Sequence, residues 1–129
     1  MNTVLAFGGT KRQRILAENV VNFCIEKLMP RMRTLDICIN LEKFEDTDAA
    51  VGYCLAVDKR EFVIEVNKCQ TKEEIITTLT HEMVHVKQYA RCELGVDEKQ
   101  DDVPYQERWY EVEAYALQDT LAEEFQAAA

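Results

Sequence analysis

The sequence predicts a single-domain α+β fold, in which an N-terminal helix, a small, mostly antiparallel three-stranded sheet and two further helices follow one another. Apolar residues recur with helical spacing near the N-terminus and again in the C-terminal half. Three short runs rich in β-branched residues lie between these helical segments. A chain of 129 residues fits one domain, so we expect residues 1–129 to share one core.

The first helix is expected over residues 11–29. Its apolar positions, from Ala17 to Leu28, recur every three or four residues, and Pro30 ends the pattern. The segment from Gly8 to Lys11 lacks the spacing of a phosphate-binding loop. We therefore interpret this segment as a turn.

Three strand-like runs follow, at Leu35–Ile39, Val51–Val57 and Phe62–Val66. Residues 58–61 are charged and predict a hairpin loop between the second and third runs. The second run is apolar at nearly every position, which is typical of a strand that is covered on both faces. We therefore expect it to lie deeper in the sheet.

Two helices are expected after the sheet. Thr71 should cap the first of them, because Glu74 follows three residues later, as in a capping box. The predicted buried stripe of this helix consists of Ile75, Leu79, Met83, Val86 and Ala90. Residues 93–104 are polar and acidic and predict a loop, after which the last helix is expected over Gln106–Phe125.

Composition narrows the classes of partner. The net charge of −9 repels phosphate backbones, so no nucleic-acid partner is expected. No stretch is long and apolar enough to cross a bilayer, and the N-terminus lacks the features of a signal peptide, so no membrane association is expected. The five cysteines form no CxxC pair, which excludes a zinc ribbon and fits a reducing compartment. These observations predict a cytoplasmic protein.

The segment that carries chemistry contains His81, Glu82 and His85. Histidines four residues apart on a helix lie one turn apart on the same face. Their ring nitrogens can bind one Zn²⁺ at about 2.0–2.1 Å, and the adjacent glutamate can hold a water without binding the metal. These are the only two histidines in the chain, which favours a shared metal over two unrelated surface histidines. Mn²⁺ or Co²⁺ would fit the same ligands.

A catalytic zinc site needs a third protein ligand and an open position. The metzincin pattern is excluded, because it would require a glycine where the chain has Gln88 and a histidine where it has Arg91. With no further histidine, the third ligand is a carboxylate or, less favoured, Cys92. The carboxylate candidates are Glu111 and Glu113, which lie about 200° apart on a helix, so that only one of them can face the metal.

The run from Thr78 to His85, followed by Glu111 three residues before Ala114, resembles the gluzincin metallopeptidases. It is most similar to the minimal SprT-like or ImmA/IrrE-like domains, which are often found in bacteria and phages. The resemblance implies a zincin-like fold, His81, His85 and Glu111 as zinc ligands, and Glu82 as the general base. Where several gluzincins carry Asp or Asn to orient a ligand histidine, this chain has Tyr115, so another group must serve. A phage-encoded member would act in the host cytoplasm.

The function predicted from these residues is hydrolysis of a peptide bond in an unidentified protein, through a zinc-bound water and Glu82 as general base. The substrate would be a protein or peptide that adds to an exposed sheet edge. An alternative is a non-catalytic zinc-binding module that regulates or binds a partner protein, with residues 93–104 as its contact. A metal-free structural domain is a third reading. No residue is assigned as the oxyanion stabiliser, although Tyr105, Arg108 and Tyr110 should flank the metal.

Overall fold

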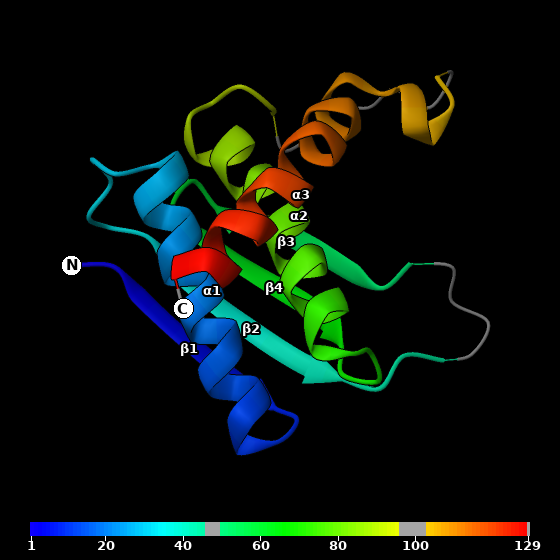
Figure 1. Ribbon diagram of the computed structural model, residues 1–129. Helices are drawn as coiled ribbons and strands as arrows, with labels where there is room; N and C mark the ends of the chain where they lie inside the picture. Colours follow the sequence, from blue (N-terminus) through cyan, green and yellow to red (C-terminus); the bar gives the residue numbers. More distant parts are fainter. Residues whose placement is uncertain (46–49, 96–102, 129) are drawn as a thin grey trace.

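The computed structural model describes residues 1–45, 50–95 and 103–128 (Figure 1). Its elements, in chain order, are β1 (Thr3–Gly8), α1 (Lys11–Leu28), β2 (Asp36–Glu42), β3 (Gly52–Asp58), β4 (Glu61–Asn67), α2 (Lys72–Ala90), the 3₁₀ helix η1 (Tyr105–Glu107) and α3 (Trp109–Ala128). The fold is α+β, but its sheet differs from the expected one.

The sheet has four strands in the order β1-β2-β4-β3. β1 pairs with β2 and β2 pairs with β4, both in parallel, while β3 runs antiparallel to β4. The expectation of a three-stranded, mostly antiparallel sheet is therefore wrong. The β3–β4 hairpin is present, but β4 pairs on its other side with β2, and the extra strand β1 continues the sheet beyond β2.

The strand β1 was not predicted. Its partner is distant in sequence, since Thr3 lies opposite Asp36, and the connection between them runs through α1. The turn at its end is the signal that could have revealed it. Gly8 has a φ of +78°, and a Cβ there would collide with the Leu41 carbonyl, so this strand-to-helix turn requires glycine. A short apolar run that ends in such a turn before a capped helix is typical of the start of a βαβ unit.

The strand β3 lies at the edge of the sheet, so the expectation that it lies deeper in the sheet is wrong. The side chains of Tyr53, Leu55 and Val57 are exposed, while Cys54 and Ala56, which alternate with them, face the helices and are partly buried. The uniform apolarity of this run misled the prediction. The run is apolar on both faces of the strand, but one face packs against the helices and the other is open to solvent.

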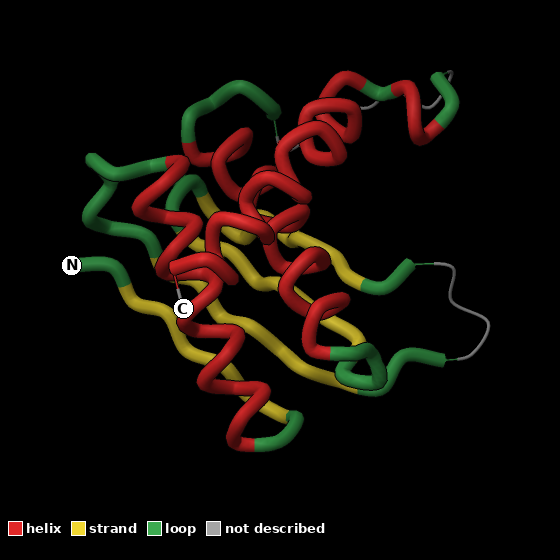
Figure 2. Tube along the Cα trace, viewed as in Figure 1, coloured by secondary structure: helices red, strands yellow, loops and turns green. Residues whose placement is uncertain are grey.

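The α-helices α1, α2 and α3 lie on one face of the sheet (Figure 2). α1 and α2 pack on the strands, and α3 packs on α2 and touches α1 without contacting the sheet. The core between sheet and helices includes Val21, Ile37, Ile39, Phe62, Ile64, Leu79 and Met83. The sheet is thus covered by a layer of α1 and α2, and α3 packs on the outside of α2.

The predicted helix ends are largely confirmed. α1 covers the expected range to within one residue and begins with a capping box at Thr10. Thr71 and Glu74 form the predicted capping box of α2, and every residue of its predicted apolar stripe is buried. Two acidic residues in the first turn of α2 also complement the helix dipole.

The last helix begins at Trp109, after the separate turn η1, rather than at Gln106. α3 approaches α2 closely, because the small side chain of Ala114 has no exposed surface and packs with Val84 and Leu121. This contact fixes the register of α3 on α2. It buries Glu111, one turn earlier on α3, in the same helix interface.

No helix among the described residues has the length and apolarity that crossing a bilayer requires.

Replacement of Gly52 tests how closely β3 approaches α2. A Cβ on Gly52 would lie 2.5 Å from Thr78 Cγ2, so Gly52→Ala should destabilise the protein by about 1–3 kcal/mol. Thr78→Ser removes that methyl group but keeps the hydroxyl that donates to Gln70. The double variant should therefore recover part of the lost free energy in urea unfolding. Equal destabilisation by Gly52→Ala in both backgrounds would contradict this contact.

Candidate metal centre

Both histidines lie in the middle of α2, on the side that faces α3. His81 and His85 are buried, and their rings meet edge to face with centroids 5.0 Å apart. The spacing of four residues brings them together, because it returns each side chain to the same side of the helix one turn later. α2 therefore presents two imidazoles to one point in the helix interface.

Glu111 approaches this point from α3. Its Oε1 lies 2.9 Å from His81 Nε2 and 3.1 Å from His85 Nε2. Only 4% of Glu111 is exposed, so its carboxylate contacts the two imidazole rings in place of solvent water. The three residues predicted as zinc ligands thus converge, with their potential ligand atoms all within 4.8 Å of one another.

The two rings are held at their other nitrogens by glutamines. Gln88 Oε1 lies 2.8 Å from His85 Nδ1, and Gln118 Oε1 lies 2.8 Å from His81 Nδ1. The orientation of the Gln88 amide is set independently, because its Nε2 donates to the Tyr110 carbonyl. An amide oxygen accepts a hydrogen bond, so each Nδ1 carries a proton and each Nε2 is left to face Glu111.

This arrangement fits a metal ion. If Nδ1 holds the only proton on each ring, two Nε2 lone pairs and a carboxylate oxygen face one another and require positive charge among them. Two ligands of a tetrahedral zinc ion at about 2.0–2.1 Å lie about 3.3 Å apart, close to the spacing between Glu111 and each ring. The donor set of two imidazoles and one carboxylate is a known catalytic zinc set.

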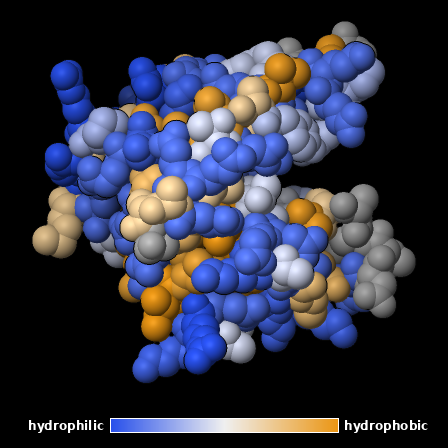
Figure 3. Space-filling view, in the orientation of Figure 1, coloured by the Kyte–Doolittle hydropathy of each residue, from blue (hydrophilic) through white to orange (hydrophobic). Residues whose placement is uncertain are grey.

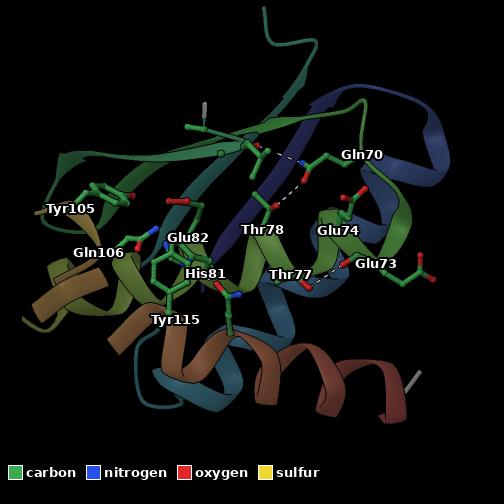
Figure 4. A pocket seen from close by; sticks show the side chains of 14 residues that line it. Gln70, Glu73, Glu74, Thr77, Thr78, His81, Glu82, Tyr105, Gln106 and Tyr115 are labelled. Carbon is green, nitrogen blue, oxygen red and sulfur yellow. Dashed lines mark hydrogen bonds between the residues drawn. The ribbon is translucent and has the colours of Figure 1, made fainter. Parts of the chain in front are cut away.

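Glu82 lies beside the three converging residues but not among them. It is 7% exposed, and no described residue donates a hydrogen bond to its carboxylate. It borders a cleft of about 800 Å³ that also reaches His81, and a smaller cavity of about 150 Å³ that reaches His85 and Glu111. Figure 4 shows Glu82 and His81 together at one end of the cleft, where Tyr105 and Tyr115 also lie.

The cleft separates the start of β3 from η1 and α3. Ala50, Val51 and Gly52 form one wall, and Tyr105, Gln106 and Tyr115 form the other, with α2 between them. In the space-filling view the molecule is hollowed at its right-hand side, between these two walls (Figure 3). The cleft therefore leads from solvent to His81 and Glu82.

Burial and neighbouring charges shift the pKa values of Glu111, His85 and Glu82. Burial raises the pKa of Glu111, but the hydrogen bonds from His81 and His85 outweigh it and hold that pKa well below its usual range. Burial lowers the pKa of His85, but the hydrogen bond to Glu111 and the charge of Glu82 outweigh it, so that pKa is raised. Burial raises the pKa of Glu82, against the neighbouring imidazoles. The centre therefore favours positive charge between Glu111 and the rings.

The other candidates for a third ligand lie elsewhere. Glu113 Oε1 accepts hydrogen bonds from Lys87 Nζ and Gln88 Nε2, both at 3.1 Å, and so supports the outer side of the centre. Cys92 is exposed, just beyond the end of α2, with a φ of 60°. The described residues that could hold a metal group as His81, His85 and Glu111, without Glu113 or Cys92.

Of the three residues expected to flank the metal, Tyr105 has the most direct contact. Its hydroxyl lies near the Glu111 carboxylate, and its pKa is raised by burial and by that carboxylate. Arg108 lies against the Tyr105 ring and donates to the Val103 carbonyl, which ties η1 to the start of α3. Tyr110 contacts the edge of the His85 ring.

The two supporting glutamines were not predicted. Sequence reasoning sought an orienting Asp or Asn at Tyr115, which instead packs against the His81 ring with centroids 4.7 Å apart. Gln88 lies three residues after His85, and Gln118 lies seven residues after Glu111, so each shares a helix face with a predicted ligand. That spacing is the signal that could have identified them.

Comparison with protein-family models, with curated proteins and with solved structures gave no match to this chain. The resemblance to gluzincins therefore depends on the motif residues alone.

Loss of the Gln118 amide should weaken metal binding without unfolding the site. Gln118→Ala removes the hydrogen bond that orients His81, so we expect zinc affinity to fall about 10–100-fold in competition with a chromophoric chelator. Gln126→Ala is the matched control, because Gln126 is exposed further along the same helix. Equal affinities for the two variants would contradict the orienting role of Gln118.

Proposed function

We propose that this protein is a zinc-dependent peptidase with a gluzincin-type ligand set. The observation that carries the proposal is the convergence of His81, His85 and Glu111 on one point, with the buried carboxylate of Glu82 beside them at the end of a cleft. A structural hydrogen-bond cluster would explain the three converging residues. It would not explain a buried glutamate that borders the same cavity with no described donor.

In this proposal His81, His85 and Glu111 hold the metal through Nε2, Nε2 and a carboxylate oxygen. A bound zinc ion would polarise the scissile carbonyl and make a water molecule more acidic. Glu82 takes a proton from the attacking water on its carboxylate and passes it to the leaving amine. Gln88 and Gln118 keep the rings in place. With Glu111 bound to a metal, the Tyr105 hydroxyl would be available to donate to charge that develops on the substrate oxygen.

The shape of the cleft supports an extended peptide as the substrate. Among the described residues, strand β3 pairs on one side only, so its other edge offers backbone groups to a further strand. The start of β3 forms a wall of the cleft, and His81 and Glu82 lie between it and α3. A peptide that pairs with β3 would pass in front of the metal ligands.

The five cysteines of the chain are all free thiols, which favours a reducing compartment. We propose the cytoplasm on that ground. The contact predicted for the alternative, a regulatory zinc-binding module, is the segment 93–104, of which residues 96–102 lie outside the described residues.

Metal analysis tests the ligand assignment. We expect about one zinc per purified chain by elemental analysis, and its loss in His81→Ala, His85→Ala and Glu111→Ala, because three protein ligands are the minimum for a catalytic site. Glu113→Ala should retain the metal, since Glu113 is bonded to Lys87 and Gln88. Zinc lost from Glu113→Ala and kept by Glu111→Ala would reverse the assignment.

A second test separates metal binding from catalysis. Glu82→Gln should keep zinc but lower peptide cleavage by about 10²–10⁴-fold, because the amide cannot accept the proton. The measurement is the appearance of new termini in a proteome-derived peptide library, with and without a zinc chelator. Glu123→Gln, on the exposed side of α3, is the control and should cleave as the wild type does. If zinc is bound but no library peptide is cut, the hypothesis of a non-catalytic, regulatory zinc-binding module is favoured over the peptidase.

Tyr105→Phe should lower kcat by about 10²-fold while KM and zinc content change little, because the hydroxyl acts on charge that develops during the reaction. The same variant leaves the ring and its contact with Arg108 intact. A rise in KM at constant kcat would instead show that Tyr105 only helps to bind the substrate.

A further inference from the structure

One face of the sheet carries no helix from the described part of the chain, since α1, α2 and α3 all lie on the other face (Figure 2). Side chains alternate along β2: Ile37, Ile39 and Leu41 are buried beneath the helices, while Cys38 and Asn40 point the opposite way. We call this opposite side the bare face. It consists of the outward side chains of β1, β2, β4 and β3.

An apolar row crosses the bare face from edge to edge. The strand registers align Leu5 with Cys38, Cys38 with Val63, and Val63 with Leu55. Leu5 is 51% exposed and Leu55 is 49% exposed, so both ends of the row are open to solvent. Contiguous exposed apolar surface of this kind marks interaction sites more often than single exposed side chains do.

Further large apolar side chains widen this row. Phe7 on β1 and Tyr53 on β3 lie in the next row, beside Leu5 and Leu55 respectively. Val57, on the other side of Leu55 along β3, is also exposed. Phe44 stacks on the Tyr53 ring with centroids 5.6 Å apart, which extends the apolar surface beyond β3. The bare face is therefore apolar along its middle and at both sheet edges.

Acidic side chains frame the row on both sides. Asp36 and Glu61 are aligned two residues before Cys38 and Val63, and Glu65 lies two residues after Val63. Glu42 follows on β2. None of these four carboxylates forms an ion pair with a described residue, and the outward positions of the four described strands include no lysine or arginine. These carboxylates are therefore available to interact with a partner or with water.

We propose that the bare face docks a basic amphipathic helix of a partner protein. A helix can bury an apolar stripe in the row and place Lys or Arg on both sides of that stripe. The acidic side chains lie two residues, or about 7 Å, from the row along the strands, within reach of such basic side chains. A second copy of the chain is a poor occupant, because the carboxylates of one face would meet those of the other. Anionic lipid headgroups would be repelled for the same reason.

The test uses the full chain and a synthetic peptide of about 18 residues, long enough to form a helix, with leucines on one side flanked by lysines. A second peptide carries glutamate in place of each lysine. We expect the lysine peptide to bind, with an affinity that falls as salt rises, and the glutamate peptide to bind at least about tenfold more weakly. Amide shifts in NMR spectra should map the lysine peptide to the four strands.

Matched variants make the test specific to this surface. Leu55→Lys should weaken lysine-peptide binding about tenfold or more, whereas Ile15→Lys should leave it nearly unchanged. Ile15 is 52% exposed on α1, so the two variants add the same charge at equally exposed aliphatic positions. Glu65→Lys should likewise weaken binding more than Glu26→Lys, which lies on the exposed side of α1.

Three results would overturn the proposal. Equal losses in Leu55→Lys and Ile15→Lys would mean that the peptide responds only to net charge. Amide shifts confined to the cleft would place binding at the metal centre. Self-association of the chain that Leu55→Lys abolishes would make the bare face an interface between copies. None of these outcomes depends on zinc binding or on cleavage, so the proposal stands or falls separately from the peptidase function.

Discussion

The structure depends on the burial of one carboxylate between two helices. Glu111 is carried by α3 into its interface with α2, where almost none of its surface is exposed. A charge in such a place is costly unless groups of opposite sign surround it. His81 and His85 meet this need at 2.9 and 3.1 Å, and a metal ion would meet it more fully. Ala114 sets the register of α3 for this contact, because its small side chain permits the close approach that brings Glu111 to the rings.

The polar network around that carboxylate is built almost entirely on one helix pair. Gln88 belongs to the same helix as His85, and Gln118 belongs to the same helix as Glu111. Each glutamine crosses or borders the interface and fixes one ring nitrogen, so that the other nitrogen faces the shared point. The sheet contributes by holding α2 in place and by supplying β3 as a wall of the cleft. Neither β1 nor β2 contributes a residue to the lining of the two cavities at the site.

The difference between local patterns and contacts between distant segments explains which predictions succeeded. The spacing of His81 and His85, the Thr71 cap and the stripe of α2 are local patterns, and local geometry decides them. The sheet was mispredicted because strand order depends on contacts between distant segments. β1 pairs with β2 across the whole of α1, and no local pattern records which strand becomes the edge. Helix geometry alone left Glu111 and Glu113 both open, and the gluzincin resemblance favoured Glu111. The packing of α3 on α2 brings Glu111 to the two rings.

Strand β3 connects the two surfaces that the molecule leaves open. Gly52, at its start, borders the cleft and lies so close to Thr78 of α2 that no larger residue fits without displacement. Further along, Leu55 and Val57 turn outward and belong to the bare face. Substrate pairing would use the backbone edge of the strand, whereas a docked helix would use its outward side chains. The two ligands would not compete for the same atoms, so a partner on the bare face could hold a peptide near the metal centre while the edge of β3 remains free.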